Sequence, residues 1–586
     1  MTVGVKIVRY LTKVKDRKKP ENIKNEFFVF DVETTKLEPM QKNFVFGVIY
    51  GFNYKKVIYS VEEFKAEFLT DRYKRKIIFA HNAEFDLLTL FGNIYDYLDN
   101  KAIFNGKFIS AKFGNVTFAD SLNIFPFSLE KIGETIGLKK LENKKVSGEG
   151  LRTSNITKKD IEYCERDCEI IFTALLGIFE SIGTIKITIA SLAMFNFRNK
   201  YLLEKIVFSE LVDEFYESYY GGRTEVFKLG KCDAKCYDIN SMYSDIMRYI
   251  NFPDIRLLKK ETKVDVKYLL YILKYEEGLA KVRILHRDSY FGFLPYRSDK
   301  LLFPIGEFCT IINFNELRFA LKQGVIEILS VDYIVHAPPM QTLFKEFIEE
   351  HYKKRLIAQK EKNDLEDYIH KYIPHSLYGR WAMRMKYETT YYNEIPFEFI
   401  AELEKTDQFH LLKTFSEVRD DCFLITENDK FINSFFAIPT FSSYITSEGR
   451  INLLKALLEN ENNGILYCDT DSIFLEGKFT GQISNILGNW KLEDKKVIEV
   501  RGLKNYSIID EKGNEKEIIK GVSKRAKKIT KGIDKGKYVA KQYFKTKEAL
   551  RRNIEAGSEK IVKKTITGKY EKRIITTNGN TKPIKL

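Results

Sequence analysis

The stretch Tyr467-Cys-Asp-Thr-Asp-Ser472 lies between two short apolar runs that read as strands. We expect these runs to pair as a β-hairpin with Asp469 and Asp471 at its tip. An isolated Asp-Thr-Asp is usually an ordinary turn, because Asp side chains bond nearby backbone amides. A further acid, Asp238, ends another strand-like run and precedes a turn. Three carboxylates at strand ends supply what nucleotidyl transfer with two divalent ions needs.

A second set of acids lies in the first third of the chain. Asp31 ends an apolar run, and Glu33, two residues later, points to the same face of that strand. Asp86 follows another apolar run, and Asp167 lies on a predicted helix, one turn after Tyr163. Taken singly, each acid is more often a surface carboxylate or a helix cap. As a set of hard oxygen ligands beside a phenol, they indicate phosphodiester hydrolysis with two divalent ions.

Three segments of this second set resemble, in order, the exonuclease motifs of family B DNA polymerases. They are Phe30-Asp-Val-Glu-Thr34, Asn82-Ala-Glu-Phe-Asp86 and Tyr163-Cys-Glu-Arg-Asp167. The resemblance implies that the four acids are metal ligands and that the tyrosine positions the attacking water: Asp31, Glu33, Asp86, Asp167 and Tyr163. It also implies a set of residues that hold the single-stranded primer end, by base stacking on the aromatic ring among them: Thr34, Asn82, Phe85, Ser121 and Leu122.

The first set of acids resembles the polymerase motifs of the same family. Tyr467–Ser472 matches the motif Tyr-x-Asp-Thr-Asp-Ser, and Asp238-Ile-Asn-Ser-Met-Tyr243 is similar to Asp-x-x-Ser-Leu-Tyr-Pro. The resemblance implies that Asp238 and Asp471 are the main metal ligands and that Asp469 is secondary. It places Tyr243 under the sugar of an incoming dNTP, where the ring excludes a 2′-hydroxyl. The implied cofactor is Mg²⁺ or Mn²⁺, with two ions at each site.

Lys371 begins the sequence KYIPHSLYGR, which resembles the fingers motif Lys-x3-Asn-Ser-x-Tyr-Gly. The resemblance implies that Lys371 and Arg355 bind the triphosphate and that Tyr378 packs against the nascent base pair. His375 stands where the family has Asn. Pro374 lies inside a predicted helix, where it removes a hydrogen bond and is expected to produce a kink.

Two further segments resemble family motifs that bind the primer terminus. They are Thr446-Ser-Glu-Gly-Arg450 and Lys504-Asn-Tyr506. The residues expected to contact DNA are therefore Thr446, Arg450, Lys504 and Tyr506.

Two long insertions favour one subgroup of the family. The chain has 132 residues between Asp238 and Lys371 and 97 between Lys371 and Asp469, whereas a fingers hairpin needs only about 40. Together with Tyr219-Tyr-Gly-Gly222 these insertions resemble the protein-primed family B polymerases. The resemblance implies that the insertions contact a terminal protein, wrap the duplex and help strand displacement during replication. It implies that Tyr219, Gly221 and Gly222 lie where template passes between the two sites.

The expected architecture is a multidomain α+β fold, with an RNase H-like 3′–5′ exonuclease domain followed by a right-hand polymerase with two insertions. The boundaries we expect are 1–187 for the exonuclease domain, 188–256 for the first part of the palm, 257–342 for the first terminal-protein-region insertion, 343–385 for the fingers, 386–435 for the second insertion, 436–530 for the second part of the palm and 531–586 for the thumb.

The charge of the chain is uneven. Residues 495–586 carry 27 Lys and Arg against 10 Asp and Glu, a net charge of +17, which leaves −2 for the first 494 residues of a chain of net charge +15. A basic segment beside a nearly neutral body is typical of a grip on phosphates, although a solvated tail has the same composition. Interleaved aromatic residues favour a folded segment, because disordered segments are poor in them.

Composition excludes several other classes of protein. No apolar stretch is long enough to span a membrane, and no signal peptide begins the chain. Seven scattered cysteines indicate reduced thiols, and two Cys-x3-Cys pairs, Cys164/Cys168 and Cys232/Cys236, lack the usual spacing of a zinc site. Abundant Lys, Ile, Asn and Phe suit an AT-rich viral or plasmid genome. We expect a monomer in the cytoplasm of a host cell, apart from a terminal-protein heterodimer.

Three alternatives stay open at this point. The first is a family B polymerase that uses a nucleic-acid primer or starts without one. The second is a non-catalytic nucleic-acid-binding protein derived from a polymerase, which the intact acids disfavour. The third is a nuclease without polymerase activity. That alternative does not explain why Asp238, Lys371, Asp469 and Asp471 match the polymerase motifs in order.

Overall fold

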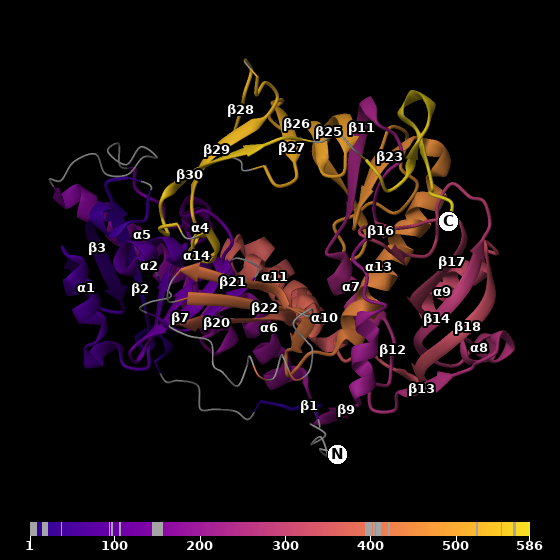
Figure 1. The fold of residues 1–586 in the computed structure, drawn as a ribbon, viewed down its shortest axis with the longest axis horizontal. Helices are drawn as coiled ribbons and strands as arrows, with labels where there is room; N and C mark the ends of the chain where they lie inside the picture. Colours follow the sequence, from indigo (N-terminus) through magenta and orange to yellow (C-terminus); the bar gives the residue numbers. More distant parts are fainter. Residues whose placement is uncertain are drawn as a thin grey trace.

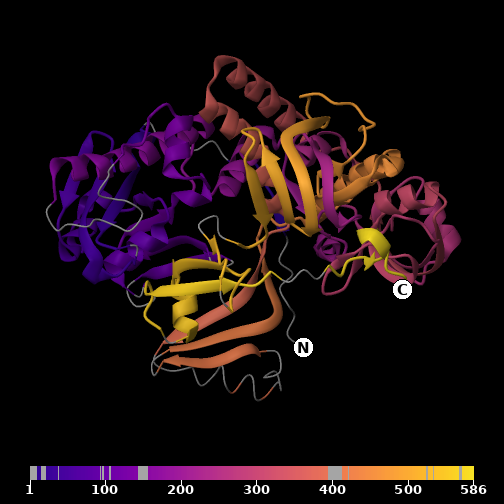
Figure 2. The same cartoon turned by 90° about the horizontal axis from the view of Figure 1, so that it is seen from above.

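The computed structural model describes most of the chain. In Figures 1 and 2, the yellow strands labelled β28–β30 lie between the N-terminal unit (indigo) and the sheet that contains β11 and β23. The described residues are 9–14, 22–36, 38–92, 94, 98–104, 107–142, 156–392, 401, 405, 412–419, 422–522, 526–531, 533–552, 554–566 and 570–586.

The N-terminal unit is built on a seven-stranded mixed sheet of order β4-β3-β2-β5-β8-β7-β6. Alternation along β2 (Phe27–Thr34) divides its side chains between two cores. Phe27 and Val29 pack under helix α5 (Lys158–Ile182), which begins at the capping box of Thr157. Phe28, Phe30 and Val32 pack on the other face, against helices α1 and α2. The remaining elements are α1 (Val61–Phe68), α2 (Ala83–Phe91), α4 (Leu129–Thr135), β3 (Phe44–Gly51), β4 (Tyr54–Ile58), β5 (Ile77–Ala80), β6 (Asp99–Phe104), β7 (Lys107–Phe113) and β8 (Val116–Asp120).

A second seven-stranded sheet forms the centre of the molecule, in the order β10-β23-β24-β11-β25-β26-β27. The predicted hairpin is confirmed, because β23 and β24 pair antiparallel around the turn at residues 470–471. Helices α7 (Met242–Tyr249) and α13 (Pro439–Glu459) pack beside this sheet. The strands are β10 (Thr224–Val226), β11 (Gly230–Ile239), β23 (Ile465–Asp469), β24 (Ser472–Leu475), β25 (Trp490–Gly502), β26 (Asn505–Asp510) and β27 (Glu515–Ile519).

The expected first insertion folds as a separate four-stranded sheet of order β13-β18-β14-β17. Its sequence pattern is mostly that of strands, but two amphipathic helices, α8 and α9, also cover the sheet. The elements are β13 (Lys259–Thr262), α8 (Val266–Ile272), β14 (Glu277–His286), β17 (Gly306–Asn313), α9 (Phe314–Lys322) and β18 (Ile326–Ala337).

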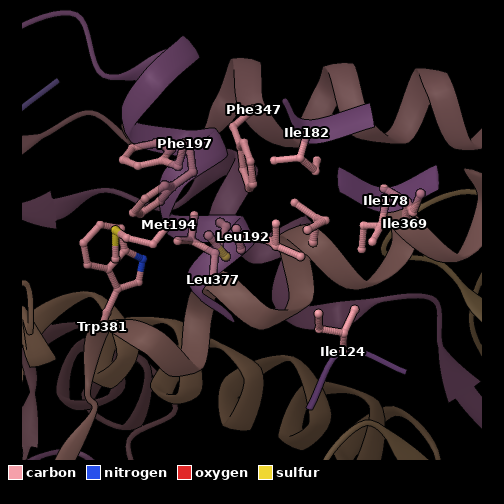
Figure 3. Packing of buried hydrophobic residues seen from close by; sticks show 14 of the residues in the cluster. Ile124, Ile178, Ile182, Leu192, Met194, Phe197, Phe347, Ile369, Leu377 and Trp381 are labelled. Carbon is pink, nitrogen blue, oxygen red and sulfur yellow. The ribbon is translucent and has the colours of Figure 1, made fainter. Parts of the chain in front are cut away.

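The expected fingers form the predicted helical hairpin, α10 (Lys345–Glu361) and α11 (Asp364–Trp381). Helix α11 is continuous through Pro374. Its apolar face joins the largest core of the molecule together with α5 and α6 (Ile189–Asn196), as Figure 3 shows for ten labelled residues. This core fixes the hairpin against the N-terminal unit.

The expected second insertion contains a three-stranded sheet of order β20-β22-β21, formed by β20 (Arg384–Tyr392), β21 (Leu412–Arg419) and β22 (Cys422–Asn433). Residues 393–400, 402–404, 406–411 and 420–421 of this predicted unit lie outside the described residues.

The basic C-terminal segment is folded. Strands β28 (Lys527–Lys528), β29 (Tyr538–Tyr543) and β30 (Glu559–Lys564) form a sheet, and α14 (Thr546–Arg552) follows β29. Ala549 and Ala556 are buried in the core of the N-terminal unit. The chain then returns to the central sheet, where the hydroxyl of Tyr570 accepts a hydrogen bond from the backbone N–H of Val226 at 2.9 Å. The expected thumb, 531–586, therefore includes a C-terminal stretch that packs elsewhere.

Within the described residues, no helix is both long enough and apolar enough to cross a membrane. The two Cys-x3-Cys pairs belong to different units, since one lies on α5 and the other on β11.

Candidate active sites

The first acid cluster lies where β2, α2 and α5 meet. Asp31 and Glu33 point to the face of β2 that α5 covers, and α5 carries Asp167. Helix α2 brings Asp86, whose carboxylate accepts a hydrogen bond from the backbone N–H of Val32 at 3.3 Å. The structure thus brings together four acids that stand far apart in the sequence.

Burial and the mutual repulsion of its carboxylates favour the binding of a cation at this cluster. Burial, followed by the charge of Asp167, raises the pKa of Asp31 to about 7. Burial and the Asp31 charge raise the pKa values of Glu33 and Asp86 well above their usual range. The buried Oδ1 of Asp167 has no hydrogen-bond partner among the described residues. Ligand atoms of Asp31, Glu33 and Cys164 lie within 4.8 Å of one another, so the donor set fits a divalent ion.

Lys140 is a member of this site that the sequence pattern does not single out. Its Nζ lies 2.5 Å from Oδ2 of Asp167, and it also hydrogen-bonds to the hydroxyl of Tyr163. The neighbouring Asp167 charge raises the pKa of Lys140 despite burial, so the ammonium group stays charged. Residues 139–145 contain several lysines, and nothing in the local sequence distinguishes Lys140 from the others. Only the fold shows that Lys140 lies beside the acids.

The five residues expected to hold a primer end differ in accessibility. Asn82 and Phe85 are partly exposed at the start of α2, and Leu122 is half-buried. Thr34 is buried, and its hydroxyl donates to the carbonyl of Lys36 at 2.6 Å. Ser121 is wholly buried. These two side chains lie behind the accessible ones, and their contact with a primer end stays a prediction.

Tyr543, from the C-terminal segment, contacts the partly exposed Asn82 and Phe85. The ring centroid of Tyr543 lies 5.9 Å from that of Phe85, edge to face, and its hydroxyl hydrogen-bonds to Asn82. Glu84 holds this contact in place, because its carboxylate pairs with Lys545 at 3.0 Å and accepts the backbone N–H of Thr546 at 3.1 Å. No sequence motif indicates this contact between residues more than 450 positions apart.

The second acid cluster lies at β11 of the central sheet and at the tip of the adjacent β23–β24 hairpin. Asp238 on β11 pairs with Ser472 on β24, and the N–H of Ile239 donates to the carbonyl of Asp471 at 2.8 Å. Burial, followed by the charges of Asp238 and Asp469, raises the pKa of Asp471 to about 7. Burial also raises the pKa of Asp238. Like the first cluster, this one fits a divalent ion.

The turn between β23 and β24 depends on a glycine from another segment. Thr470 has φ of 63°, and its N–H donates to the carbonyl of Arg223 at 2.7 Å. A Cβ at Gly222 would meet the side chain of Thr470 at 2.7 Å, so this position requires glycine. Tyr219, Gly221 and Gly222 thus lie beside the second cluster, with Gly221 exposed.

Asp469 is held at the hairpin tip by two neighbours. The hydroxyl of Tyr467 donates to its Oδ2 at 3.0 Å, and Nζ of Lys504 lies 3.2 Å from the same oxygen. Tyr506 packs edge to face on Phe474, 4.9 Å between centroids. Lys504 and Tyr506, expected at the primer terminus, therefore border the acids.

Three cations face the second cluster. Burial and the charges of Arg355 and Lys491 lower the pKa of Lys371, which shows how closely the three cations gather. Nζ of Lys491 lies 3.6 Å from Oδ1 of Asp238. Arg355 also pairs with Asp367 on α11, at 3.0 Å. The sequence pattern does not indicate Lys491, because it becomes a neighbour of Asp238 only through the register of β11 and β25.

Two expected nucleotide contacts stack on each other. The ring centroids of Tyr243 and Tyr378 lie 4.5 Å apart with the planes at 37°. The hydroxyl oxygen of Tyr378 lies 3.4 Å from that of Tyr219. Helix α7, helix α11 and the Tyr219 segment therefore meet at one point.

Thr446 and Arg450, expected to contact DNA, both lie in the interior. Thr446 is wholly buried in α13, and its hydroxyl donates to the Ser442 carbonyl at 3.0 Å. Arg450 is 3% exposed and donates to the carbonyls of Tyr220 and Gly221, at 2.8 and 3.0 Å. Arg450 thereby supports the segment that borders the hairpin, and the contact of these two residues with DNA stays a prediction.

Comparison with solved structures matches the fold along nearly the whole chain. Phi29 DNA polymerase complexed with primer-template DNA and incoming nucleotides superposes with a TM-score of 0.66 at 17% identity, over 93% of this chain and 99% of that one. The same polymerase complexed with single-stranded DNA gives a TM-score of 0.64, over 89% and 96%. The multidomain α+β architecture is therefore that of a DNA polymerase.

Proteins that are similar to this chain in sequence are also named as DNA polymerases. The DNA-directed DNA polymerase of Enterobacteria phage PRD1 is 27% identical over 519 residues, 84% of this chain and 84% of that protein. A "Probable DNA polymerase" of Neurospora intermedia is 29% identical over 345 residues, and the match spans 34% of its length. The family model of type B DNA polymerases, organellar and viral, matches residues 137–452, more than half of the chain. The chain belongs to this family of organellar and viral type B DNA polymerases.

Proposed function

We propose that the chain is a template-directed DNA polymerase with its own 3′→5′ proofreading exonuclease, which replicates a viral or plasmid genome inside a host cell. One observation carries the polymerase half. Asp238 on β11 and Asp471 in the turn that precedes the adjacent strand β24 are 233 positions apart in the sequence, have raised pKa values and lie near Lys371. Adjacent acids opposite clustered cations suit the transfer of a nucleotide from a triphosphate.

The units take the following roles in this proposal. The N-terminal unit, 1–187, is the exonuclease domain, and the central sheet with α7 and α13 is the palm. Helices α10 and α11 are the fingers, and the β28–β30 sheet with α14 is the thumb. Residues 570–586 belong with the palm, because they return to it. The β13–β18 unit and the β20–β22 unit are the two insertions.

In the polymerase site, Asp238 and Asp471 would hold two divalent ions, Mg²⁺ or Mn²⁺, with Asp469 in support. Ions bound there would supply activation of the primer 3′-hydroxyl and neutralisation of charge on the leaving group. Lys371, Arg355 and Lys491 lie where they neutralise triphosphate oxygens. The Tyr243 ring lies under the incoming sugar, and Tyr378 packs against the new base pair.

In the exonuclease site, Asp31, Glu33, Asp86 and Asp167 hold the ions. The Tyr163 hydroxyl orients the attacking water, and Lys140 fixes that hydroxyl and Asp167 in one geometry. Phe85, Asn82 and Leu122 hold the frayed primer end, with Thr34 and Ser121 behind them. A grip by ring stacking accepts any base, as proofreading requires.

The initiation step of this proposal is protein priming by a terminal protein. The support is the presence of both folded insertions, and the likeness along most of the chain to the polymerases of PRD1 and phi29. Incubation with a candidate terminal protein, labelled dNTP and Mg²⁺ tests it. Covalent dNMP on that protein supports priming by protein, whereas extension of DNA primers alone supports the nucleic-acid-primed alternative.

Primer extension and primer trimming by the same preparation test both catalytic halves. Asp471→Ala should lower extension at least on the order of 100-fold and spare trimming, and Asp31→Ala should do the reverse. Asp233→Ala is the matched control, because Asp233 lies on β11 with Asp238 but is exposed and pairs with Lys496. Trimming without extension in the unmodified protein would leave a nuclease alone. Loss of neither activity in the variants would leave the acids without their proposed roles.

A further inference from the structure

The connection between β24 and β25 leads into a lysine of the polymerase site. Lys491 is the second residue of β25, and the register of the sheet places it opposite Asp238. Its Nζ lies 3.6 Å from Oδ1 of Asp238 and 2.5 Å from Oε1 of Glu493. A lysine side chain is long and flexible, so its ammonium group is placed accurately only where the backbone that carries it is held. Residues 484–490, the 484–490 loop, immediately precede this lysine.

Asn240 makes four hydrogen bonds to the 484–490 loop. Its side-chain amide donates to two carbonyls, those of Ser484 at 2.8 Å and Ile486 at 3.3 Å. Its backbone N–H and carbonyl form two further bonds with the backbone of residues 488–489, at 3.0 and 2.9 Å. Because Asn240 lies two positions after Asp238, these bonds fasten the loop to the end of β11.

The loop has a defined shape of its own. Gly488 has φ of 81°, and a Cβ there would collide with the carboxylate of Asp245 on the first turn of α7, so this position requires glycine. The side-chain amide of Asn489 donates to Oγ of Ser484 at 2.8 Å, and the N–H of Ser484 donates to the Trp490 carbonyl at 2.8 Å. The loop is therefore a compact unit that can transmit a position from one side to the other.

The other side of the loop rests on helix α10. The N–H of Leu487 donates to the hydroxyl of Tyr352 at 3.2 Å, and Leu487 is 9% exposed. Tyr352 lies three residues before Arg355, so the two side chains share one face of α10. The same leucine lines a cavity of about 20 Å³ together with Arg355 and Lys371. The loop thus lies directly against the two helices that carry these cations.

We propose that the 484–490 loop braces helix α10 against the end of β11 and thereby keeps Lys491 within reach of an incoming triphosphate. Asn240 and Tyr352 are the positioning residues at the two sides of this brace. A triphosphate carries its charge on several oxygens, so a group of cations binds it well only when their relative positions are kept. This inference rests on the proposed polymerase function, because the contact of Lys491 with the triphosphate belongs to that proposal.

Hydrogen exchange of the DNA-free protein tests the brace without catalysis. Asn240→Ala and Tyr352→Phe should each speed the exchange of the amides in residues 484–490 by roughly 2- to 10-fold, because each removes bonds that hold the loop. Asn452→Ala is the matched control. It removes a bond from the Asn452 amide to the hydroxyl of Tyr249 on α7, at 2.9 Å, so exchange in the loop should stay unchanged. Unchanged exchange in Asn240→Ala overturns the proposal.

The affinity for the next correct dNTP, measured on a dideoxy-terminated primer–template with Ca²⁺, tests the consequence for Lys491. Lys491→Ala should weaken this affinity about 10-fold, and Asn240→Ala roughly 2- to 10-fold. In a protein that already carries Lys491→Ala, adding Asn240→Ala should cause little further loss, because Asn240 acts through the lysine. Asn452→Ala should leave the affinity unchanged. Equal losses from Asn240→Ala with and without the lysine overturn its positioning role.

The two measurements separate this inference from the function on which it rests. If Lys491→Ala leaves the dNTP affinity unchanged, the proposed contact of Lys491 with the triphosphate is wrong, and the brace loses its purpose. If the unmodified protein binds no dNTP, the polymerase proposal fails, and hydrogen exchange alone decides whether the loop braces α10 against β11.

Discussion

Arg450 and Glu316 form a buried two-point ion pair. Nε and Nη2 of Arg450 each lie 2.7 Å from one carboxylate oxygen of Glu316. The two residues are 3% exposed, and they join palm helix α13 to helix α9 of the first insertion. Because Arg450 also donates to the Tyr220 and Gly221 carbonyls, one guanidinium connects α9, α13 and the segment beside the β23–β24 hairpin.

Arg450→Met should be strongly destabilising, because it leaves a buried Glu316 carboxylate without its cation. Breaking one side of such a pair costs about 3–5 kcal/mol. The double change Arg450→Met with Glu316→Leu should recover part of this loss, since no buried charge is then left. Thermal unfolding of the single and double variants measures the difference. Equal midpoints for Arg450→Met and the unmodified protein would show that the pair contributes little.

Tyr243→Ala should raise the incorporation of ribonucleotides relative to deoxyribonucleotides, by roughly 10- to 100-fold, because the pocket no longer rejects a 2′-hydroxyl. The ring is held firmly, since it packs on Tyr378 and since Gly449 leaves it room: a Cβ there would meet the Tyr243 ring at 3.0 Å. Competition between rNTP and dNTP in primer extension measures the ratio.

Tyr243→Phe keeps the ring and loses only the hydroxyl, so it serves as the control and should retain the selectivity. Unchanged sugar selectivity in Tyr243→Ala would remove the assignment of this residue to the sugar pocket.

The sequence was sufficient for features that depend on local pattern. The expected hairpin is present, and the strand that carries Asp238 ends one residue after it, at Ile239, whereas the strand that carries Asp31 continues past it to Thr34. These signals lie within a few residues of the feature that they predict. Local pattern thus predicts which elements carry the acids.

Contacts across the fold could not be predicted in the same way. Lys140 and Lys491 reach the acids only through tertiary packing and strand register, and Tyr543 reaches Phe85 from the other end of the chain. The burial of Thr446 and Arg450 has the same origin, since a motif does not show which of its side chains face inward. These positions depend on contacts between distant parts of the chain. Hydrophobic periodicity predicts local helices and strands and gives no signal for such contacts.

Stability of the metal-free protein should fall as the pH rises from about 4 to about 7. Asp31 and Asp471 have an ordinary pKa of 3.8 that the fold raises to about 7. In this window the folded protein keeps protons that the unfolded chain releases, so the free energy of unfolding decreases with pH. Mg²⁺ binds the deprotonated acids, so its stabilising effect should be larger at about pH 8 than at about pH 5.

Thermal unfolding with and without Mg²⁺ at the two pH values measures this effect. The double variant Asp31→Asn with Asp471→Asn should lose most of the Mg²⁺-dependent shift, because it removes one anion from each cluster. A Mg²⁺ shift of the same size at both pH values would contradict the raised pKa values.

Tyr543→Ala should strengthen the binding of single-stranded ends to the exonuclease site. In the structure Tyr543 lies edge to face on Phe85 and hydrogen-bonds to Asn82, two partly exposed side chains that are proposed to hold such an end. A strand must displace that ring, and an aromatic pair of this kind contributes about 0.5–1.5 kcal/mol. Its loss should lower KM for trimming single-stranded DNA by roughly 2- to 10-fold, with little change in kcat. Steady-state hydrolysis of a labelled oligonucleotide gives both constants.

Two further variants separate this competition from direct binding of DNA by the tyrosine. Tyr543→Phe keeps the ring over Phe85 and loses the bond to Asn82, so its KM should fall between those of the alanine variant and the unmodified protein. Phe85→Ala removes the platform itself and should raise KM. If KM rises in Tyr543→Ala as well, the tyrosine is part of the grip on the primer end, because a competitor cannot weaken binding by its removal. The C-terminal segment would then help to bring the frayed end to the acids of the N-terminal unit. The contacts of Glu84 with Lys545 and Thr546 would fix the position of Tyr543 relative to those acids.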